Sequence, residues 1–210
     1  MVNWLKEEWN QLASKFTNDM NLVNELWIEI HKRYSSKNRY YHNLNHIYNM
    51  FQHMYKIEAK ITELDEFKFS IWYHDIIYKS TSKDNEIQSA LTASKILNTL
   101  NIDSKSIEKI KQMIISSHKH EVILDKNLDN AYFLDIDLSI LGTTNDSYQD
   151  YIKSIRKEYK IYPDLLYNPG RKKVLKKFQQ REHIFFTSYF IKNFEKQARL
   201  NLTSELLKLS

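Results

Sequence analysis

The chain has 210 residues, enough for one well-buried core, and its 31 Lys and Arg against 26 Asp and Glu give a formal net charge of +5. Two glycines and two prolines leave little material for hairpins and tight βα turns. The absence of cysteine excludes disulfides, thiolate zinc sites and a thiol nucleophile. We therefore expect an all-α fold in which nitrogen and oxygen ligands hold any metal.

Helical periodicity runs along most of the chain, with no repeat, linker or low-complexity tract, so a single domain over residues 1–210 is expected. Asp19 or a neighbouring residue is expected to cap the first predicted helix. The predicted helices, in chain order, cover about residues 22–30, 44–55, 67–76, 84–97, 106–117, 131–141, 148–159, 171–180 and 183–209. Residues 163–170, which contain both prolines and one glycine, are expected to form a turn.

The N-terminal residues include acidic side chains where a signal peptide needs an apolar stretch, and no apolar run approaches the length of a membrane span. The lysines are scattered, so the positive charge favours anionic partners only weakly. We expect a cytoplasmic protein with no membrane partner and no specific nucleic-acid binding. The aromatic content would permit a homodimer.

Histidines and aspartates recur on the apolar faces of separate predicted helices. His42 and His46 are four residues apart, so they face one side of a helix and can grip one ion together, although this spacing alone is a weak signal. The dipeptide His74-Asp75 lies in the predicted 67–76 helix, and Asp137 faces the core side of the 131–141 helix, with Asp135 further round. Burying several such groups unpaired costs several kcal/mol, so they should pair or share a divalent cation.

The order His46, His74-Asp75 and Asp137 resembles the HD superfamily of metal-dependent phosphohydrolases. Further segments resemble the predicted bacterial group of these enzymes: Arg39-x-Tyr41-His42-x-x-x-His46, Trp72-Tyr73-His74-Asp75-x-x-Tyr78, Asp84-Asn85-Glu86-x-x-Ser89-Ala90, Leu134-Asp135-x-Asp137-Leu138-x-x-Leu141-Gly142, Arg156-Lys157-Glu158-Tyr159, Gly170-Arg171-x-x-Val174-Leu175 and Glu195-x-x-Ala198-Arg199-x-Asn201-Leu202. The resemblance covers nearly the whole chain. It implies an HD-domain helical bundle with extra C-terminal helices and a metal held by His46, His74, Asp75 and Asp137.

The stretch Tyr41-His42-Asn43-x-x-His46 is also similar to the first metal motif of cyclic-nucleotide phosphodiesterases, another HD branch. This similarity implies that His42 is the general acid and that His46 is a ligand. A histidine near a cation can hold a proton at neutral pH when an acidic neighbour supports it. The alternative for His42 is a structural hydrogen bond at the start of the helix.

Arg39 lies just before the ligand helix, where its guanidinium can bind a phosphate through two parallel hydrogen bonds. Alternatively, it pairs with a carboxylate such as Asp84 or Glu86. Glu86 is expected to hydrogen bond to a ligating histidine. His118 and His120 follow a predicted helix and supply either a second metal site or a solvent-facing loop.

The resemblance implies hydrolysis of a phosphoester of a small molecule, with a nucleotide as the expected substrate, by a metal-activated water. The catalytic residues would be His42, Asp75 and Arg39, and the substrate contacts would come from Arg39, Glu86, His118 and His120. The cofactor would be Mn, Co, Ni, Zn, Fe or Mg, because nitrogen and oxygen ligands accept several ions. The alternatives are a di-iron oxygenase, if His118 or His120 completes a two-metal site, and a non-catalytic nucleotide-binding module.

Overall fold

The computed structural model describes residues 1–124 and 126–209, which form ten α-helices, two short 3-10 helices and no strand. The expected all-α class is confirmed. No helix in the described residues is long and apolar enough to cross a membrane. The chain divides into two compact units, Met1–Phe133 and Leu134–Ser210. The single HD-type domain over residues 1–210 stays a prediction.

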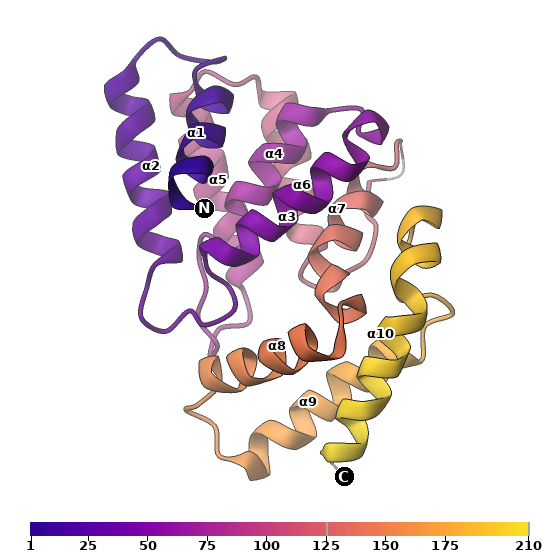
Figure 1. The fold of residues 1–210 in the computed structure, drawn as a ribbon. Coiled ribbons are helices and arrows are strands. Elements are labelled where there is room, and N and C mark those ends of the chain that lie inside the picture. Colours follow the sequence, from indigo (N-terminus) through magenta and orange to yellow (C-terminus); the bar gives the residue numbers. More distant parts are fainter. Residues whose placement is uncertain (125, 210) are drawn as a thin grey trace. The chain divides into compact units, whose positions relative to one another are not determined.

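The first unit consists of helices α1 to α6 and the beginning of α7. The bounds are α1 (Val2–Ala13), α2 (Met20–Tyr34), α3 (Leu44–Ile57), η1 (Glu58–Lys60), α4 (Leu64–Tyr73), α5 (Asn85–Thr99), α6 (Ser104–Ser116) and α7 (Asp129–Leu138). Within this unit α1 packs on α2, α3 on α4, and α6 on both α4 and α5 (Figure 1). The Asp19 cap is confirmed, because its carboxylate accepts the backbone N–H of Asn21 and of Leu22. Helix α1 lies outside the predicted helices.

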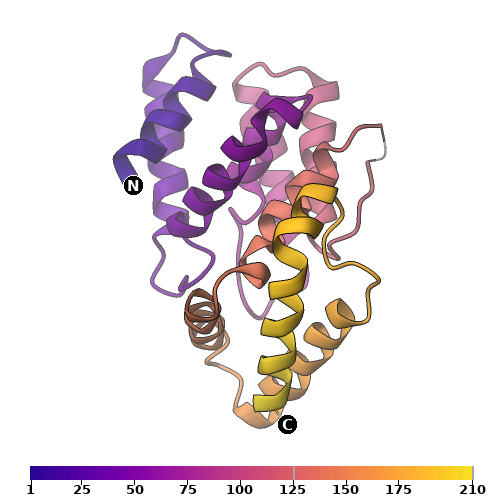
Figure 2. The ribbon, with the colours of Figure 1, turned by 45° about the vertical axis from the view of Figure 1, so that its right-hand side comes forward.

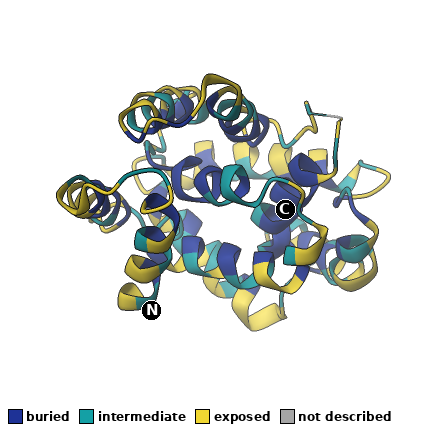
Figure 3. Ribbon diagram, turned by 90° about the horizontal axis from the view of Figure 1, so that it is seen from above, coloured by how far each residue is buried: buried dark blue, intermediate teal, exposed yellow. Residues whose placement is uncertain are grey.

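The core of the first unit is built from large aromatic side chains around Trp72. The fully buried Trp72 ring meets the rings of Trp9, Trp27 and Phe51 at centroid distances of 5.0–6.2 Å. The Trp9 indole N–H donates to the Val23 carbonyl at 2.9 Å, so the only polar atom of that ring is satisfied inside the core. Along most helices the buried residues follow one face and the exposed residues the other (Figure 3). Rigid aromatic packing therefore surrounds the C-terminal end of α4.

The second unit contains the end of α7 and four further elements. These are η2 (Ser139–Gly142), α8 (Asn145–Glu158), α9 (Asp164–Gln179) and α10 (Ser188–Lys208). Helix α10 packs on η2 and on α9, and α9 and α10 lie side by side in Figure 2. Arg171 of α9 and Glu205 of α10 form a buried bidentate ion pair with N–O distances of 2.7 and 3.0 Å. This pair fixes the register of the two helices.

The turn expected over residues 163–170 is wrong, because α9 begins at Asp164 and continues through Pro169 and Gly170. Pro163 is the N-cap, a position where the helix does not need a backbone N–H. Pro169 lies in the second turn, so its missing N–H would have bonded to the Leu165 carbonyl. Leu165 is 84% exposed, and water can supply the missing donor.

Two other helix boundaries differ from the predictions. Helix α10 begins at Ser188 rather than near residue 183, because the backbone amides before it donate to side-chain carboxylates instead of to helix carbonyls. Glu195 accepts from the amides of residues 184 and 185, and Asp135 accepts from those of residues 186 and 187. Helix α7 ends at Leu138 and continues as η2.

Replacing each of the two glycines by alanine is expected to have opposite effects on the stability of the fold. A Cβ at Gly142 would lie 2.7 Å from both the Cβ and the carbonyl oxygen of Phe194 in α10, whereas a Cβ at Gly170 meets nothing within 4 Å. Gly142→Ala is expected to lower the free energy of unfolding by about 1–3 kcal/mol through overpacking. Gly170→Ala is expected to raise it by about 0.5–1 kcal/mol, as for alanine inside a helix. Urea unfolding of both variants tests this, and a destabilised Gly170→Ala or an unaffected Gly142→Ala would contradict it.

The half-buried His53 of α3 is expected to make the stability of the fold sensitive to acid. Burial, assisted by Lys56, lowers the pKa of His53 to about 4. In the unfolded chain the pKa of this imidazole is near 6.5. Between pH 6.5 and pH 4 the unfolded state therefore binds more protons than the folded state. The free energy of unfolding falls as the pH is lowered through this range. Between pH 7 and pH 5 the wild type should lose about 1–2 kcal/mol more than His53→Gln. Urea unfolding at both pH values measures the difference, and equal losses would refute the prediction.

Candidate metal centre

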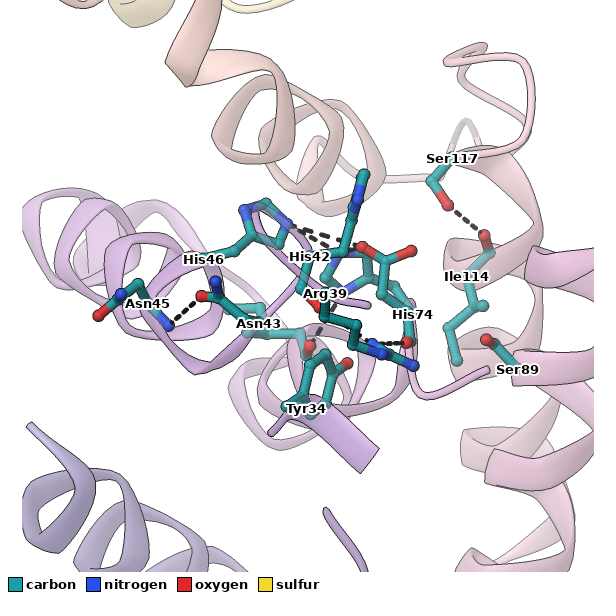
Figure 4. A network of polar contacts seen from close by, with 12 residues as sticks. Tyr34, Arg39, His42, Asn43, Asn45, His46, His74, Ser89, Ile114 and Ser117 are labelled. Atoms are coloured by element: carbon teal, nitrogen blue, oxygen red, sulfur yellow. Dashed lines mark hydrogen bonds and ion pairs between the residues drawn. The ribbon is translucent and has the colours of Figure 1, made fainter. Parts of the chain in front are cut away.

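His46 lies in the first turn of α3, whose start is fixed by Asn43. The Asn43 side-chain oxygen accepts the backbone N–H of Asn45 at 2.8 Å (Figure 4). Its amide nitrogen donates to the Tyr40 carbonyl at 2.9 Å. One residue therefore caps the helix and holds the preceding loop. The His46 side chain points inward and the residue is 4% exposed.

His74 and Asp75 lie just beyond a helix and not within it, which corrects the sequence prediction. Helix α4 ends at Tyr73, His74 is the C-cap, and the carbonyls at this end bind side chains from elsewhere. The Tyr34 hydroxyl donates to the Trp72 carbonyl at 2.9 Å, and Arg39 donates to the carbonyls of residues 75 and 76 at 2.6 and 3.0 Å. A guanidinium at a helix C-terminus also complements the helix dipole. These bonds fix the backbone that carries both side chains.

Helix α5 holds the segment that follows Asp75. The Ser89 hydroxyl accepts the N–H of Ile77 at 3.0 Å and donates to its carbonyl at 3.2 Å. The Asn85 side chain binds the N–H and the carbonyl of Lys79 at 3.0 and 2.9 Å. These bonds explain two polar positions of the segment Asp84-Asn85-Glu86-x-x-Ser89-Ala90 that the sequence left without a role.

Three potential ligand atoms converge between α3 and the end of α4. The two imidazole Nε2 atoms of His46 and His74 are 3.1 Å apart, and the Asp75 Oδ2 atom lies 3.0 Å from His74 Nε2 and 3.8 Å from His46 Nε2 (Figure 4). All three residues are buried. In the described part of the chain, this is the one group of three His, Cys, Asp or Glu residues with ligand atoms within 4.8 Å of one another.

The tautomer of His74 determines which group its Nε2 atom presents to Asp75. Its Nδ1 lies 2.9 Å from the Ile71 carbonyl and must donate to it, because a carbonyl only accepts. In the neutral ring Nε2 then presents a lone pair to the Asp75 carboxylate. Burial raises the pKa of the Asp75 carboxyl, but positive charge on the neighbouring imidazoles, His74 foremost, outweighs burial and holds the pKa well below its usual range. A lone pair and a carboxylate oxygen repel at this distance unless a proton or a cation lies between them.

The three atoms fit the requirements of a transition-metal ion. Bonds of about 2.0–2.2 Å place neighbouring ligand atoms about 3.0–3.5 Å apart, close to the separations between His46, His74 and Asp75. The hydrogen bond from His74 Nδ1 to a backbone carbonyl is the usual support for an imidazole that binds metal through Nε2. The donor set of two nitrogens and one oxygen suits Mn, Co, Ni, Zn or Fe better than Mg.

His42 precedes α3 and is not on the same helix as His46, so the expected pair on one helical face is wrong. Its ring stacks on the Tyr78 ring with a centroid distance of 4.1 Å and lies 6.0 Å from the ring of His46. His42 is only half-buried and its charge contributes to the low pKa of Asp75. It therefore stands beside the three ligand atoms without belonging to that group.

Arg39 binds neither of the carboxylates considered from the sequence. Besides the two carbonyls beyond α4, its Nη1 donates to the His42 carbonyl at 3.1 Å, and its guanidinium lies 4.9 Å from the Tyr34 ring centroid. Arg39 thus connects the loop of His42 to the turn of Asp75. Its role as a phosphate ligand stays a prediction.

The other predicted site residues occupy different environments. Glu86 accepts from Nδ1 of the half-exposed His118 at 3.0 Å, so its histidine partner is not a member of the three-ligand group. His120 lies in the turn after α6 with a positive φ of 51°. Asp137 lies near the end of α7 in the second unit, and its role as a fourth ligand stays a prediction. Asp135 is fully buried and accepts three hydrogen bonds from residues 186 and 187, so both of its oxygens are occupied.

No family model matches the chain, and comparisons with curated proteins and with solved structures yield no match. The site therefore rests on its own geometry. The supporting residues that sequence reasoning missed are Tyr34, Asn85 and Ser89, together with the Tyr78 ring. The last three belong to segments already singled out, and Tyr34 had no sequence signal beyond its place on the buried stripe of its helix.

Proposed function

We propose that this protein is a metal-dependent phosphohydrolase of the HD type, acting on a small phosphorylated molecule such as a nucleotide. The observation that carries the proposal is the buried convergence of His46, His74 and Asp75 around a position that calls for positive charge. The sequence resemblance supplies the reaction class. Between Asp135 and Asp137, the oxygens of Asp135 are taken up by backbone and hydroxyl donors, and a fourth ligand from Asp137 stays a prediction of the sequence resemblance.

Each residue near the centre has a proposed task. A divalent cation bound here would lower the pKa of a coordinated water toward neutrality and neutralise charge on a phosphoryl oxygen. His42, half-buried and stacked on Tyr78, would donate a proton to the leaving oxygen. Arg39 would act as a positioning residue, because it fixes the carbonyls of both His42 and Asp75.

The activity is tested with a panel of nucleotides and phosphomonoesters in the presence of Mn²⁺, Co²⁺, Ni²⁺ or Mg²⁺. We expect turnover of at least one phosphoester that depends on added metal and is abolished in the His74→Ala/Asp75→Ala variant. Equal rates for the two proteins would contradict the proposal. Tight nucleotide binding without turnover would contradict it in favour of a non-catalytic module.

His42 is expected to affect catalysis but not metal affinity. His42→Gln should lower kcat about 100-fold or more, which is the usual contribution of a general acid to the rate. The metal dissociation constant should stay nearly unchanged. The exposed His183 offers a matched control, and His183→Gln should behave as the wild type. Parallel losses of metal binding and of turnover in His42→Gln would instead identify His42 as a ligand.

A further inference from the structure

Helix α9 in the second unit has two dissimilar faces. Tyr167, Leu175 and Phe178 are buried and lie on one side of the helix. Successive residues of a helix are turned by about 100° around its axis. The residues that face away from this buried side fall within an arc of about 140° around the axis of α9. We call this arc the outer face of α9; it contains Leu165, Leu166, Pro169, Lys172, Lys173, Lys176 and Lys177.

The first turn of the outer face is apolar and exposed. Leu165 is 84% exposed and Leu166 is 62% exposed, and Ile161, just before the helix, is 66% exposed. Single exposed aliphatic residues are ordinary on protein surfaces. Three such side chains within six residues of chain place a protruding apolar group at one end of α9.

The remainder of the outer face is basic. It carries four lysines and no carboxylate, and the one acidic residue of α9 is Asp164 in its first turn. Asp164 forms an ion pair with Arg156 at 2.7 Å, while the one arginine of α9, Arg171, is turned inward to Glu205. Positive charge therefore gathers on the same side of the helix as the exposed leucines.

We propose that the outer face of α9 docks onto an anionic lipid surface, with Leu165 and Leu166 entering the interface and the four lysines contacting headgroup phosphates. Aliphatic side chains gain free energy when they leave water for the acyl boundary, and each nearby lysine is attracted to anionic lipid. A nucleic acid would bind the lysines but leave the leucines in water. An anionic lipid surface can contact both the apolar and the basic part of the outer face. The expectation of no membrane partner came from the lack of long apolar runs, which concerns spanning and not surface docking. The proposal is independent of the phosphohydrolase activity.

Co-sedimentation of the full chain with vesicles tests this proposal. The vesicles contain phosphatidylcholine alone or with about one third phosphatidylglycerol, at low and at high salt. We expect binding to the anionic vesicles only, weakened by salt. Leu165→Ser/Leu166→Ser should lower the partition coefficient about tenfold. Replacing the four lysines of the outer face with glutamine should lower it about 100-fold or more.

Two control variants match these changes elsewhere on the chain. Ile87→Ser/Leu91→Ser removes two exposed aliphatic side chains from α5, and Lys6, Lys37, Lys83 and Lys95, all exposed, are replaced together by glutamine for the same change in net charge. Both controls should bind as the wild type does. Absence of wild-type binding, or equal losses in the controls, would overturn the proposal. Unchanged binding by the leucine variant would also overturn it and identify a purely electrostatic surface, as for a nucleic acid. The leucine variant decides the matter even if the lysine variant folds poorly.

Discussion

Asp75→Asn is expected to abolish most metal binding and turnover while leaving the fold intact. The asparagine keeps the size of the side chain but not its charge. The proposed metal position beside His74 Nε2 therefore loses its anionic ligand. The metal dissociation constant should rise at least about 100-fold, the upper end of what losing support for a ligand costs. Turnover should fall about 1000-fold, because Lewis-acid stabilisation is worth several kcal/mol. The Arg39 anchor uses the backbone carbonyl of this residue, so the turn should survive.

Calorimetric titration with Mn²⁺ and steady-state rates measure both effects. Asp65→Asn is the matched control, because Asp65 is a more exposed aspartate of the same unit that pairs with Lys15 at 2.6 Å. The control should bind metal and turn over substrate as the wild type does. An Asp75→Asn variant with wild-type affinity would remove Asp75 from the ligand set.

Glu205→Gln is expected to cause the largest loss of stability in the second unit. Arg171 is 9% exposed and Glu205 is 3% exposed, and Glu205 also accepts the Tyr148 hydroxyl at 2.5 Å. Neutralising the carboxylate leaves a buried guanidinium without its counter-charge, which typically costs about 3–5 kcal/mol. Urea unfolding of the variant measures the change in the free energy of unfolding.

Two further variants separate burial from charge. Arg171→Met/Glu205→Leu removes both charges and should recover most of the loss, because a desolvated pair contributes little net free energy against an apolar pair. Asp150→Asn breaks the exposed ion pair with Lys153 and should cost less than about 1 kcal/mol. A Glu205→Gln variant that loses no more than Asp150→Asn would refute the structural role of the buried pair.

Helical periodicity predicted the all-α class and most helices, because apolar residues recur on the faces that are buried in the structure. It also brought His46, His74 and Asp75 together as candidates, since each polar side chain interrupts an apolar stripe. Periodicity does not show where a helix ends, and the chemistry at this site depends on two such ends. At the end of α4, Tyr34 binds the carbonyl of Trp72 in the last turn, and Arg39 binds the carbonyls of residues 75 and 76 just beyond the helix. Neither interaction has a local signal in the sequence.

Other differences lie at the start of α10 and along α9. The start of α10 is displaced because Asp135 and Glu195 bind the amides ahead of it. Helix α9 passes through Pro169, although proline and glycine together usually indicate a turn. The phosphate-binding role of Arg39 stays a prediction, and its contacts with backbone carbonyls depend on the fold and have no signal in the sequence.

Anomalous diffraction from crystals soaked in Mn²⁺ tests the central claim most directly. The account predicts one strong peak in the first unit within bonding distance of His46 Nε2, His74 Nε2 and Asp75 Oδ2. A peak away from these three atoms, or none after soaking, would contradict it.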